Sequence, residues 1–554
     1  MLRHSSKFAT FARGFVAIAA LAIVATQYAV AGDDADTTSA YLAQSLKQPS
    51  VTIADTTIRT EALREVYSAN GNQLLWVDSS GLTRRARKAL DVITAASEQG
   101  LDANLFAART IRTLHSMPRG TAEQATARRV GLDMLMSNAV LRYATTMNRG
   151  TVRPQANTGI AALSTAEQAA MLTAAAATRD TAGYLASLTP QAAPYATMKT
   201  MLADYQTIAK NGGWPEFTVG KPIKPGMSDA RVASLREMLT ITGDMKKTST
   251  DSLTYDEAIV EGVKQFQQRH GIEADGVLGA STQAALAVPV SKRIEQIAMT
   301  MERMRWMPRD LGDRYVLVNI PSYQLTAVAG GKQMEMNVVV GKTASPTPMF
   351  SKAITDVVFN PSWGVPAKIA VNEMLPKIRK NPGYLASAGF TVVSNGEAVD
   401  PTAVDWESVG HGNFNYAIRQ NPGSGNALGK VKFTIPDSDN IYLHDTSNRG
   451  VFTRSDRDLS HGCVRLGDPR AFTQFLLQSE GWSEAKIDAS YDSATSKTVK
   501  ITPMPVHLVY WTSWVDSSGR PHFTRDIYGK DKALLAAMAT PQPRSSDSVK
   551  LAMN

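Results

Sequence analysis

The stretches Tyr442-Leu-His-Asp445 and Ser460-His-Gly-Cys-Val-Arg-Leu466 bring one thiol and two imidazoles close together in the chain. Cys463 is the only cysteine among the 554 residues. A thiol is a strong nucleophile only as the thiolate, and an imidazole such as that of His444 or His461 can accept its proton. The two stretches together therefore favour a cysteine nucleophile with a histidine base.

Two neighbours strengthen this interpretation. Gly462 leaves the backbone bare beside the sulfur, so that N–H groups can approach a developing oxyanion. Arg465 adds a fixed positive charge two residues further on. Against it stands the commoner case, in which a lone cysteine is a buried small hydrophobe and the histidines are structural. Zinc binding is disfavoured, because His-x-Cys lacks the usual paired ligand spacing and no second cysteine exists.

The motif resembles the signature of the L,D-transpeptidases with a YkuD-type catalytic domain. The resemblance extends from Arg314 to about Thr502, and the flanking regions look like those of the large, YcbB-like periplasmic members. It implies a peptidoglycan-synthesising enzyme that cleaves the bond between meso-diaminopimelate and D-alanine in a tetrapeptide stem. The acyl group is then held as a thioester and passed to the side-chain amine of another diaminopimelate, which makes a 3-3 crosslink.

The resemblance also implies a role for each residue of the site. Cys463 is the expected nucleophile and His444 the expected base, with the backbone carbonyl of Asp445 fixing its tautomer. The N–H groups of Gly462 and Cys463 are expected to form the oxyanion hole. His461 is a second catalytic candidate, although closeness along a turning chain does not by itself aim its ring at the sulfur.

The remaining expectations for the site concern ligands. The expected substrate-binding residues are Tyr442, Arg465, Ser460 and Trp363. Stem peptides are the expected donor and acceptor, β-lactams of the carbapenem type the expected inhibitors, and other cell-wall enzymes candidate partners. The mechanism requires no metal and no organic cofactor.

The N-terminus predicts export. Arg3, Lys7 and Arg13 precede an apolar run from Phe15 to Ala25, which is too short to span a bilayer comfortably, and Ala29-Val-Ala31 offers a signal-peptidase site. We therefore expect a signal peptide over 1–31 and a periplasmic protein; a retained inner-membrane anchor is the alternative. An odd cysteine in an exported chain indicates a reactive or intermolecular thiol.

Composition is that of an ordinary globular protein, with 43% hydrophobic and 20% charged residues. The length suggests about three or four domains. The net charge of +9 would suggest nucleic acid in a cytosolic protein, but export argues against that partner. A weak attraction to an anionic wall polymer is one interpretation of this charge, and a solvated surface is the simpler one.

The sequence predicts an α+β multidomain protein. Residues 32–215 show helical periodicity and are expected to form an all-α scaffold, with one alanine-rich helix over 159–188. Residues 216–292 resemble a three-helix peptidoglycan-binding domain, through Val263-Lys-Gln-Phe-Gln-Gln-Arg-His-Gly271 and the glycines after it. The resemblance does not establish binding, and a module that only packs against its neighbours is the alternative.

Residues 293–505 are expected to form the mainly-β catalytic domain, because the periodicity changes from helical to alternating. An insertion over 361–428 has an expected helix over 366–378, and long loops in compact domains are usually lids, binding loops or disorder. The resemblance implies that this insertion is a capping subdomain over the active site. Residues 506–554 are expected to form a C-terminal extension, with a strand over 507–515 and a disordered tail from Ala539.

Three rival functions remain at this point. An L,D-carboxypeptidase would form the same thioester and pass it to water, and the sequence does not identify the acceptor. A non-catalytic peptidoglycan-binding protein would keep the module at 216–292, but it would not need Cys463 together with His444. A papain-like protease would have its histidine far downstream of the cysteine, whereas here both histidines precede it.

Overall fold

The structure is a computed structural model, which describes residues 35–118, 120–152, 163–247, 252–381 and 383–539. The expected signal peptide at 1–31 and the expected tail from residue 540 onward lie outside these residues. Within the described part of the chain, no helix combines the length and the apolar character needed to cross a membrane.

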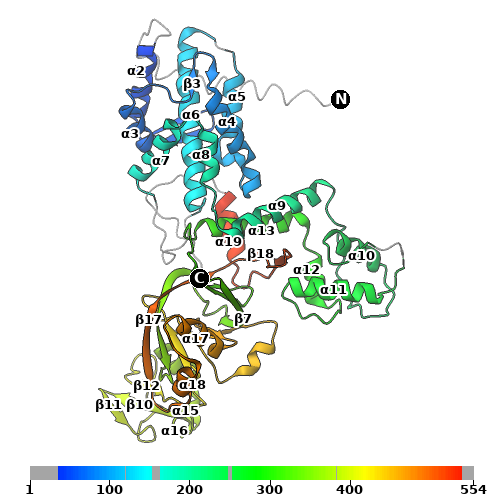
Figure 1. The fold of residues 1–554 in the computed structure, drawn as a ribbon, viewed down its shortest axis with the longest axis vertical. Helices are drawn as coiled ribbons and strands as arrows, with labels where there is room; N and C mark the ends of the chain where they lie inside the picture. The colour runs from blue at the N-terminus through cyan, green and yellow to red at the C-terminus, as the bar shows by residue number, and fades with distance from the viewer. Residues whose placement is uncertain (1–34, 119, 153–162, 248–251, 382, 540–554) are drawn as a thin grey trace.

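The fold is α+β and multidomain, as predicted. Figure 1 shows a helical region at one end, a β-rich region at the other, and a small helical module that projects to the side between them. The helical region, the side module, the β-rich region and its insertion each have a cluster of buried hydrophobic side chains.

The helical region is built around α6 (Ala122–Arg149), which is buried along most of its length. A capping box starts this helix, in which Thr121 and Gln124 each accept the other's backbone N–H. The alanine-rich stretch forms two helices instead of one, because the carboxylate of Asp180 accepts the N–H of Gly183 and starts a new helix. The other helices are α2 (Ala35–Leu46), α3 (Glu61–Ala69), α4 (Arg84–Thr94), α5 (Ala108–Ser116), α7 (Thr165–Ala177), α8 (Thr181–Ser187) and α9 (Ala193–Lys210).

Short strand pairs and 3-10 turns complete this region. They are β1 (Ser50–Ile53), β2 (Thr56–Arg59), β3 (Val77–Asp78), β4 (Gly81–Leu82), η1 (Ala95–Gln99) and η2 (Ala103–Phe106).

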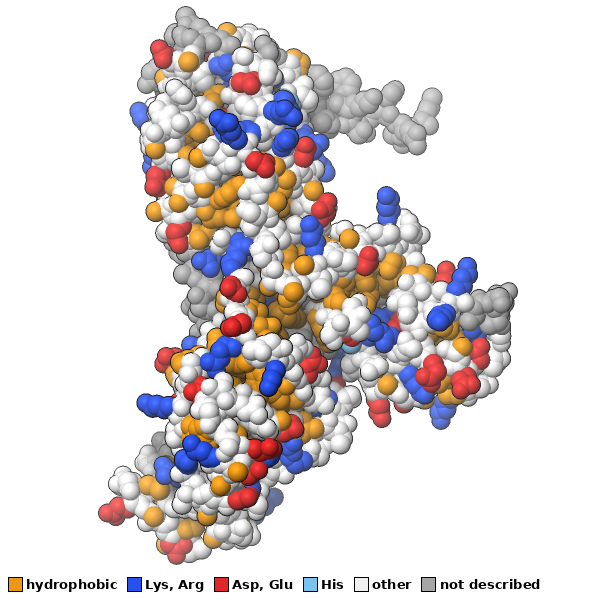
Figure 2. All heavy atoms as spheres, in the orientation of Figure 1, with side chains coloured by type: hydrophobic (Ala, Val, Ile, Leu, Met, Phe, Trp, Pro, Cys, Tyr) orange, Lys and Arg blue, Asp and Glu red, His pale blue; other side chains and the backbone are white. Residues whose placement is uncertain are grey.

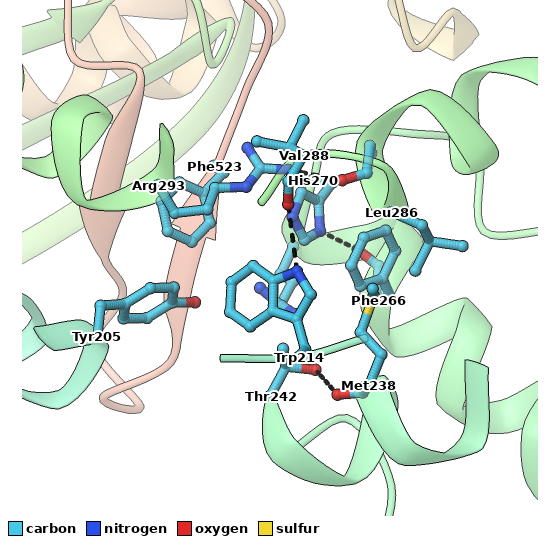
Figure 3. Close-up of a pocket in the computed structure, with 12 residues that line it drawn as sticks. Tyr205, Trp214, Met238, Thr242, Phe266, His270, Leu286, Val288, Arg293 and Phe523 are labelled. Carbon is cyan, nitrogen blue, oxygen red and sulfur yellow. Dashed lines mark hydrogen bonds between the residues drawn. The ribbon is translucent and has the colours of Figure 1, made fainter. Parts of the chain in front are cut away.

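The side module consists of α10 (Arg231–Ile241), α11 (Glu257–Arg269) and α12 (Ala280–Leu286). Figure 3 shows its junction with the rest of the chain, where the His270 ring stacks 3.8 Å from that of Phe266 and 5.8 Å from that of Phe523. The indole N–H of Trp214 donates to the carbonyl of Val288 at 3.2 Å. The cavity left at this junction measures about 10 Å³, room for about one water, so the module is packed tightly against its neighbours.

Helix α13 (Val290–Arg305) joins the helical region to the C-terminal part of the chain. Its Gln296 amide donates to the carbonyls of Thr512 and Thr524, at 2.8 and 2.9 Å. At its end, the buried Arg305 guanidinium donates to the hydroxyl of Tyr195 on α9. The helix is therefore held by buried polar contacts on two sides.

The β-rich region contains a closed barrel. Its nine-stranded sheet has the order β15-β7-β16-β14-β13-β8-β17-β5-β6, and the pairing of β6 with β7 closes eight of these strands into a ring. The strands are β5 (Arg314–Asn319), β6 (Gln324–Ala329), β7 (Lys332–Gly341), β8 (Phe350–Phe359), β13 (Val431–Thr434), β14 (Leu443–His444), β15 (Asp458–Ser460), β16 (Val464–Leu466) and β17 (Lys497–Val509).

The barrel differs from the sequence prediction in several strands and in one boundary. Strands β6, β15 and β16 were not predicted. Strand β17 runs across the expected domain boundary at residue 505, because its last residues, Val506 to Val509, pair with β5 and belong to the barrel. Helices α17 (Pro469–Gln478) and α18 (Glu484–Asp492) and the turn η4 (Arg449–Thr453) complete this region.

The C-terminal segment, residues 510–539, continues from the barrel. It contains the hairpin β18 (Ser513–Val515) and β19 (Pro521–Phe523), then α19 (Lys530–Ala539). The strand predicted over 507–515 is thus divided between β17 and β18.

The insertion between β8 and β13, residues 361–428, is a small subdomain that we call the cap. Its sheet has the order β11-β10-β12-β9, and its core is separate from that of the barrel. The helix predicted over 366–378 is interrupted by a π-helical turn, η3 (Ala370–Met374), and continues to Lys380. The remaining elements are β9 (Trp363–Gly364), α14 (Ala367–Ile369), α15 (Leu375–Lys380), α16 (Tyr384–Ser387), β10 (Phe390–Ser394), β11 (Glu397–Val399) and β12 (Ala417–Gln420).

Charges are mixed over the surface. On the face drawn in Figure 2, lysine and arginine side chains are interspersed with aspartate and glutamate over every region. The excess of nine positive charges is therefore not gathered into one basic patch on that face, which favours a solvated surface there.

Candidate active site

The residues of the motif meet on one face of three neighbouring strands. His444 on β14 is paired with Lys432 on β13 and with Arg465 on β16. Residues paired across a sheet point to the same side, and side chains alternate along each strand. Tyr442 and Cys463, one alternation back from His444 and Arg465, therefore share this face. We call these five residues the reactive face.

The opposite side of the same strands faces the barrel core. Leu443, Val464 and Phe433, which alternate with the residues of the reactive face, are fully buried in that core. The reactive face is thus on the outside of the barrel, on strands whose inner side is held by hydrophobic packing. This arrangement holds the polar residues on a rigid support.

His444 is buried, and its ring orientation is fixed. Its Nδ1 lies 2.5 Å from the carbonyl oxygen of Asp445. A carbonyl can only accept a hydrogen bond, so Nδ1 carries the proton and Nε2 has the free lone pair. Burial, together with the nearby positive charges of Arg465 and Lys432, lowers the pKa of His444 to about 3. The imidazole is therefore neutral at neutral pH and available as a proton acceptor.

The Asp445 carboxylate takes no part in that contact. It accepts the backbone N–H groups of Lys430 and Thr446, at 2.8 and 2.7 Å, and pairs with Arg449 at 3.2 Å. Only the main chain of Asp445 touches the imidazole, which is the arrangement that the resemblance implied. The side chain instead anchors the segment that follows the strand.

Cys463 is half-buried beside Tyr442. Burial raises the pKa of the Cys463 thiol, and hydrogen bonds from the backbone and side chain of Tyr442, together with the charges of Lys432 and Arg465, act in the opposite direction. The thiol also donates to the carbonyl of Asn440 at 3.5 Å. The thiol and the His444 imidazole are thus both neutral at rest, which suits proton transfer during attack more than a preformed ion pair.

The turn that carries the sulfur is closed by Ser460. The Ser460 hydroxyl donates to the Cys463 carbonyl at 2.6 Å and accepts the Gly462 N–H at 3.1 Å. Gly462 has φ of +117°, and a side chain there would approach Ile441 to 3.1 Å, so this position requires glycine. The expected substrate contact of Ser460 is corrected here: its side chain is buried and shapes the turn.

The oxyanion hole differs from the prediction in the same place. The N–H of Gly462 is already bonded to Ser460, so it does not face a substrate. Within the described residues, the N–H of Cys463 has no hydrogen-bond partner. The structure therefore leaves the Cys463 N–H, and not that of Gly462, as the donor available to an oxyanion.

His461 points toward the cap. Its Nε2 lies 2.6 Å from the carboxylate of Glu373, which belongs to η3, and 3.1 Å from the amine of Lys342. The side chain is about a third exposed. Among the described residues, His461 forms no hydrogen bond to Cys463, and its partners differ from the backbone carbonyl that holds His444.

Two cations border the sulfur. Arg465 was predicted, whereas Lys432 was missed. Neither side chain has a hydrogen-bond or ion-pair partner among the described residues, and the Nε of Arg465 is buried without one. Burial lowers the pKa of both groups. The Lys432 amine also lies 4.3 Å from the centre of the Tyr442 ring. Unpaired, partly buried cations are suited to bind a carboxylate.

The signal for Lys432 was the alternation of Val431, Phe433 and Ile435, which places Lys432 on the opposite side of the strand. The neighbour of that strand could not be read from the sequence, so its pairing with His444 was not predicted.

Trp363 reaches the site from the cap. Its side chain lies next to that of Tyr442, the residue beside the sulfur, and acts to lower the pKa of the Tyr442 hydroxyl, which burial raises. Its ring lies 6.4 Å from that of Phe390 in the cap. Trp363 is thus placed at the border between the cap and the reactive face. Over the described residues, no group of three or more His, Cys, Asp or Glu side chains is arranged to hold a metal ion.

Comparison with known families agrees with this geometry. Residues 313–501 match the model of the L,D-transpeptidase catalytic domain, YkuD. This part of the chain is thus similar to a YkuD-type L,D-transpeptidase catalytic domain. Residues 61–202 match a scaffold domain, and residues 228–286 a putative peptidoglycan binding domain. The first match covers the whole reactive face.

A relative with similar sequence is a putative L,D-transpeptidase of Haemophilus influenzae, 36% identical over 253 residues. The match covers 45% of this chain and 51% of the relative, so the chain spans about half the length of the curated relative that it matches.

Two solved structures are also similar over part of the chain. An L,D-transpeptidase (Yku) from Stackebrandtia nassauensis is 13% identical, with a TM-score of 0.21, over 53% of this chain and 96% of that one. The LD transpeptidase LdtMt1, solved in complex with imipenem, is 14% identical, with a TM-score of 0.18, over 36% and 59% of the two chains.

Proposed function

We propose that the protein is a cysteine L,D-transpeptidase of peptidoglycan that forms 3-3 crosslinks between stem peptides. The observation that carries this proposal is the neutral pair of His444 and Cys463, with Nδ1 of the imidazole held by the Asp445 carbonyl. The matched catalytic domain supports a peptidoglycan-modifying activity, and the finer reaction is our inference from the site.

The proposed reaction begins when the Cys463 thiol transfers its proton to Nε2 of His444 and the sulfur attacks the carbonyl of meso-diaminopimelate. The carbonyl oxygen becomes an oxyanion that the Cys463 N–H stabilises. The D-alanine amine leaves with the proton from His444, which produces a thioester. The side-chain amine of a second diaminopimelate then attacks the thioester, gives its proton to His444 and releases the sulfur.

The charges of the reactive face fit this substrate. A tetrapeptide stem carries a carboxylate on its terminal D-alanine and another on diaminopimelate. Lys432 and Arg465 offer positive charge without an internal partner, beside the sulfur that would attack the bond between these two residues. A carboxylate bound there would satisfy a cation that is costly to leave unpaired.

The deciding experiment is product analysis. Purified protein is incubated with disaccharide-tetrapeptides, and the products are separated and identified by mass spectrometry, with Cys463→Ala as the control. We expect a 3-3 crosslinked dimer and free D-alanine from the wild type and neither from the variant. Disaccharide-tripeptide without dimer would instead identify an L,D-carboxypeptidase, and no reaction in any condition would leave only a binding role.

Two further expectations belong to this proposal. A carbapenem should acylate Cys463 with one adduct per chain, because its carbonyl can occupy the position of the peptide carbonyl; intact-mass analysis of wild type and Cys463→Ala tests this. The site of action is the periplasm, which the basic and apolar N-terminal residues support. Fractionation of cells that produce the tagged protein would test the location.

A further inference from the structure

A short loop between β7 and β8 forms hydrogen bonds to residues 460–463, the turn that carries Cys463. The Thr347 hydroxyl donates to the Gly462 carbonyl at 2.7 Å, and the contact is buried. The backbone N–H of Lys342, in the same loop, donates to the Ser460 carbonyl at 2.9 Å. Two residues of this loop thus donate hydrogen bonds to two carbonyls, those of Ser460 and Gly462, in the turn that carries Cys463.

The contact of Thr347 bears on the oxyanion donor through the geometry of the peptide bond. The carbonyl of Gly462 and the N–H of Cys463 belong to the same peptide unit, which is planar and in which the two groups point in opposite directions. A hydrogen bond that holds the Gly462 carbonyl therefore also fixes the direction of the Cys463 N–H. That N–H is the donor that the turn leaves available.

The hydrogen bond from Thr347 is important because the backbone of this turn has an unusual conformation at Gly462. Gly462 has a positive φ, a region that glycine alone enters readily and from which it can also leave readily. Without an external contact, the peptide after Gly462 would have more freedom to rotate. The Ser460 hydroxyl restrains this turn from inside, and Thr347 restrains it from outside.

Thr347 is in turn held by the C-terminal segment. The Tyr528 hydroxyl accepts the N–H of Thr347 at 3.2 Å and donates to the carbonyl of Gly341 at 2.5 Å. The Gly341 N–H donates to the Thr347 hydroxyl at 2.8 Å. Tyr528, Thr347 and the end of β7 therefore form a closed set of hydrogen bonds in which each donor has one acceptor.

The position of Tyr528 is itself determined by its neighbours. Its backbone N–H donates to the Tyr510 hydroxyl at 2.9 Å, and that hydroxyl donates to Asp526 at 2.6 Å. The rings of Tyr510 and Tyr528 are stacked, with centroids 5.7 Å apart. A continuous series of hydrogen bonds thus runs from the C-terminal segment to the peptide beside the nucleophile.

We propose that Thr347 and Tyr528 are positioning residues of the transpeptidase, which orient the Cys463 N–H toward the oxyanion. Neither side chain touches the substrate; both act through the Gly462–Cys463 peptide. The C-terminal segment, which follows the matched catalytic domain in sequence, is thereby part of the catalytic machinery. This inference rests on the proposed function, since it assumes that acylation passes through an oxyanion.

The test compares two reactions of the same thiol. Acylation by a carbapenem, or by the simple ester 4-nitrophenyl acetate, forms an oxyanion and needs the N–H donor. Alkylation by iodoacetamide displaces iodide at a saturated carbon and forms no oxyanion. In Thr347→Val we expect acylation to slow by about tenfold to a hundredfold, less than the loss from removing an oxyanion donor outright. Alkylation should change by no more than about twofold.

Further variants test whether the loss of acylation depends on the hydroxyl groups of Thr347 and Tyr528. Thr347→Ser keeps the hydroxyl and should acylate at about the wild-type rate, and Tyr528→Phe should slow acylation by about threefold to tenfold, since it removes only the support of Thr347. Thr473→Val and Tyr491→Phe are matched controls. Their hydroxyls also make buried hydrogen bonds in the catalytic domain, but on α17 and α18, away from the turn. Both should acylate at the wild-type rate.

The outcomes separate a positioning role from a structural one. Equal losses in acylation and alkylation for Thr347→Val, or no loss in either, would overturn the inference. Circular dichroism and thermal unfolding of each variant identify one that fails to fold, and Tyr528→Phe then decides by the same ratio of rates. Wild-type protein that the ester acylates, but that forms no peptidoglycan product, would refute the proposed function alone. Wild type that no acylating probe modifies would refute both.

Discussion

The reactive face and the cap hold their functional side chains in different ways. On the reactive face, His444 lies on a strand whose inner side is packed in the barrel core, and its ring is fixed by a buried contact. The cap reaches the site through Glu373, whose partners His461 and Lys342 are about a third or more exposed. Buried, multiply bonded groups keep one geometry, whereas exposed ion pairs contribute little and exchange easily.

We assign the chemistry and the substrate selection to different parts of the molecule. The groups that we propose transfer protons and form bonds are on the barrel. The cap has its own sheet and core, and it touches the site through Trp363 and Glu373. We therefore expect changes in the cap to affect large substrates and changes on the barrel to affect every substrate.

Among changes to the cap and to the charges around the sulfur, the largest expected effect comes from removing the cap. Phe359 pairs with Val431, and the N–H of Asn360 donates to the carbonyl of Lys430, so the ends of the insertion meet where β8 and β13 are paired. Replacing residues 361–428 by a short hairpin loop should leave the barrel folded. Turnover of disaccharide-tetrapeptide should fall by about a hundredfold, because positioning of the substrate is lost.

The control for the cap deletion is iodoacetamide, whose reaction with Cys463 should stay near the wild-type rate. A deletion variant that keeps full transpeptidation, with the folded barrel verified by circular dichroism, would refute the division between barrel and cap.

An intermediate effect is expected from Lys432. In Lys432→Met the stem remains and the charge is lost, so the sulfur and the developing oxyanion have one cation fewer nearby. We expect carbapenem acylation to slow by about tenfold, measured by stopped-flow fluorescence or intact mass. Lys430→Met is the matched control, because its amine pairs with Asp492 and the carbonyl of Tyr491, away from the sulfur. Equal rates for both variants would remove Lys432 from the site.

The smallest effect is expected from the contact between the cap and the turn. His461→Ser and Glu373→Gln each break the same exposed pair, so either change should alter tetrapeptide turnover by about threefold or less. The double variant should behave like either single one, since the interaction is lost only once. Additive losses in the double variant would show that the two residues act separately.

Much of this fold could be predicted, because it depends on local patterns. The helical periodicity of residues 32–215 and the alternation around Tyr315 and Val431 are visible in the sequence alone. Strand β6 was missed because its six residues contain few bulky apolar side chains. The end of the barrel at Val509 depends on pairing with β5, and a domain boundary set by pairing between distant strands has no local signal.

The candidate site was predicted where the motif is local and missed where it depends on strand register. Cys463, His444 and Arg465 belong to the motif itself. Lys432, Glu373 and Thr347 reach the site from three other segments, and only the folded sheet brings them there. The oxyanion donor was assigned to Gly462 as well as Cys463, because the sequence does not reveal that Ser460 already occupies the Gly462 N–H.

We infer that His444, and not His461, is the base, and that its imidazole is neutral at rest. The most direct test is the rate of carbapenem acylation across pH for the wild type, His444→Ala and His461→Ser. Burial lowers the pKa of His444 to about 3, so protonation removes the base only as pH falls toward that value.

We predict that the wild-type rate stays flat from about pH 8 to about pH 5 and falls only below that, and that His461→Ser follows it. His444→Ala should be slower by about a hundredfold or more at pH 7, and its rate should rise about tenfold per pH unit, because only the thiolate then reacts. If His461→Ser is instead the inactive protein and His444→Ala keeps the wild-type rate and pH profile, then His461 is the base and His444 is not.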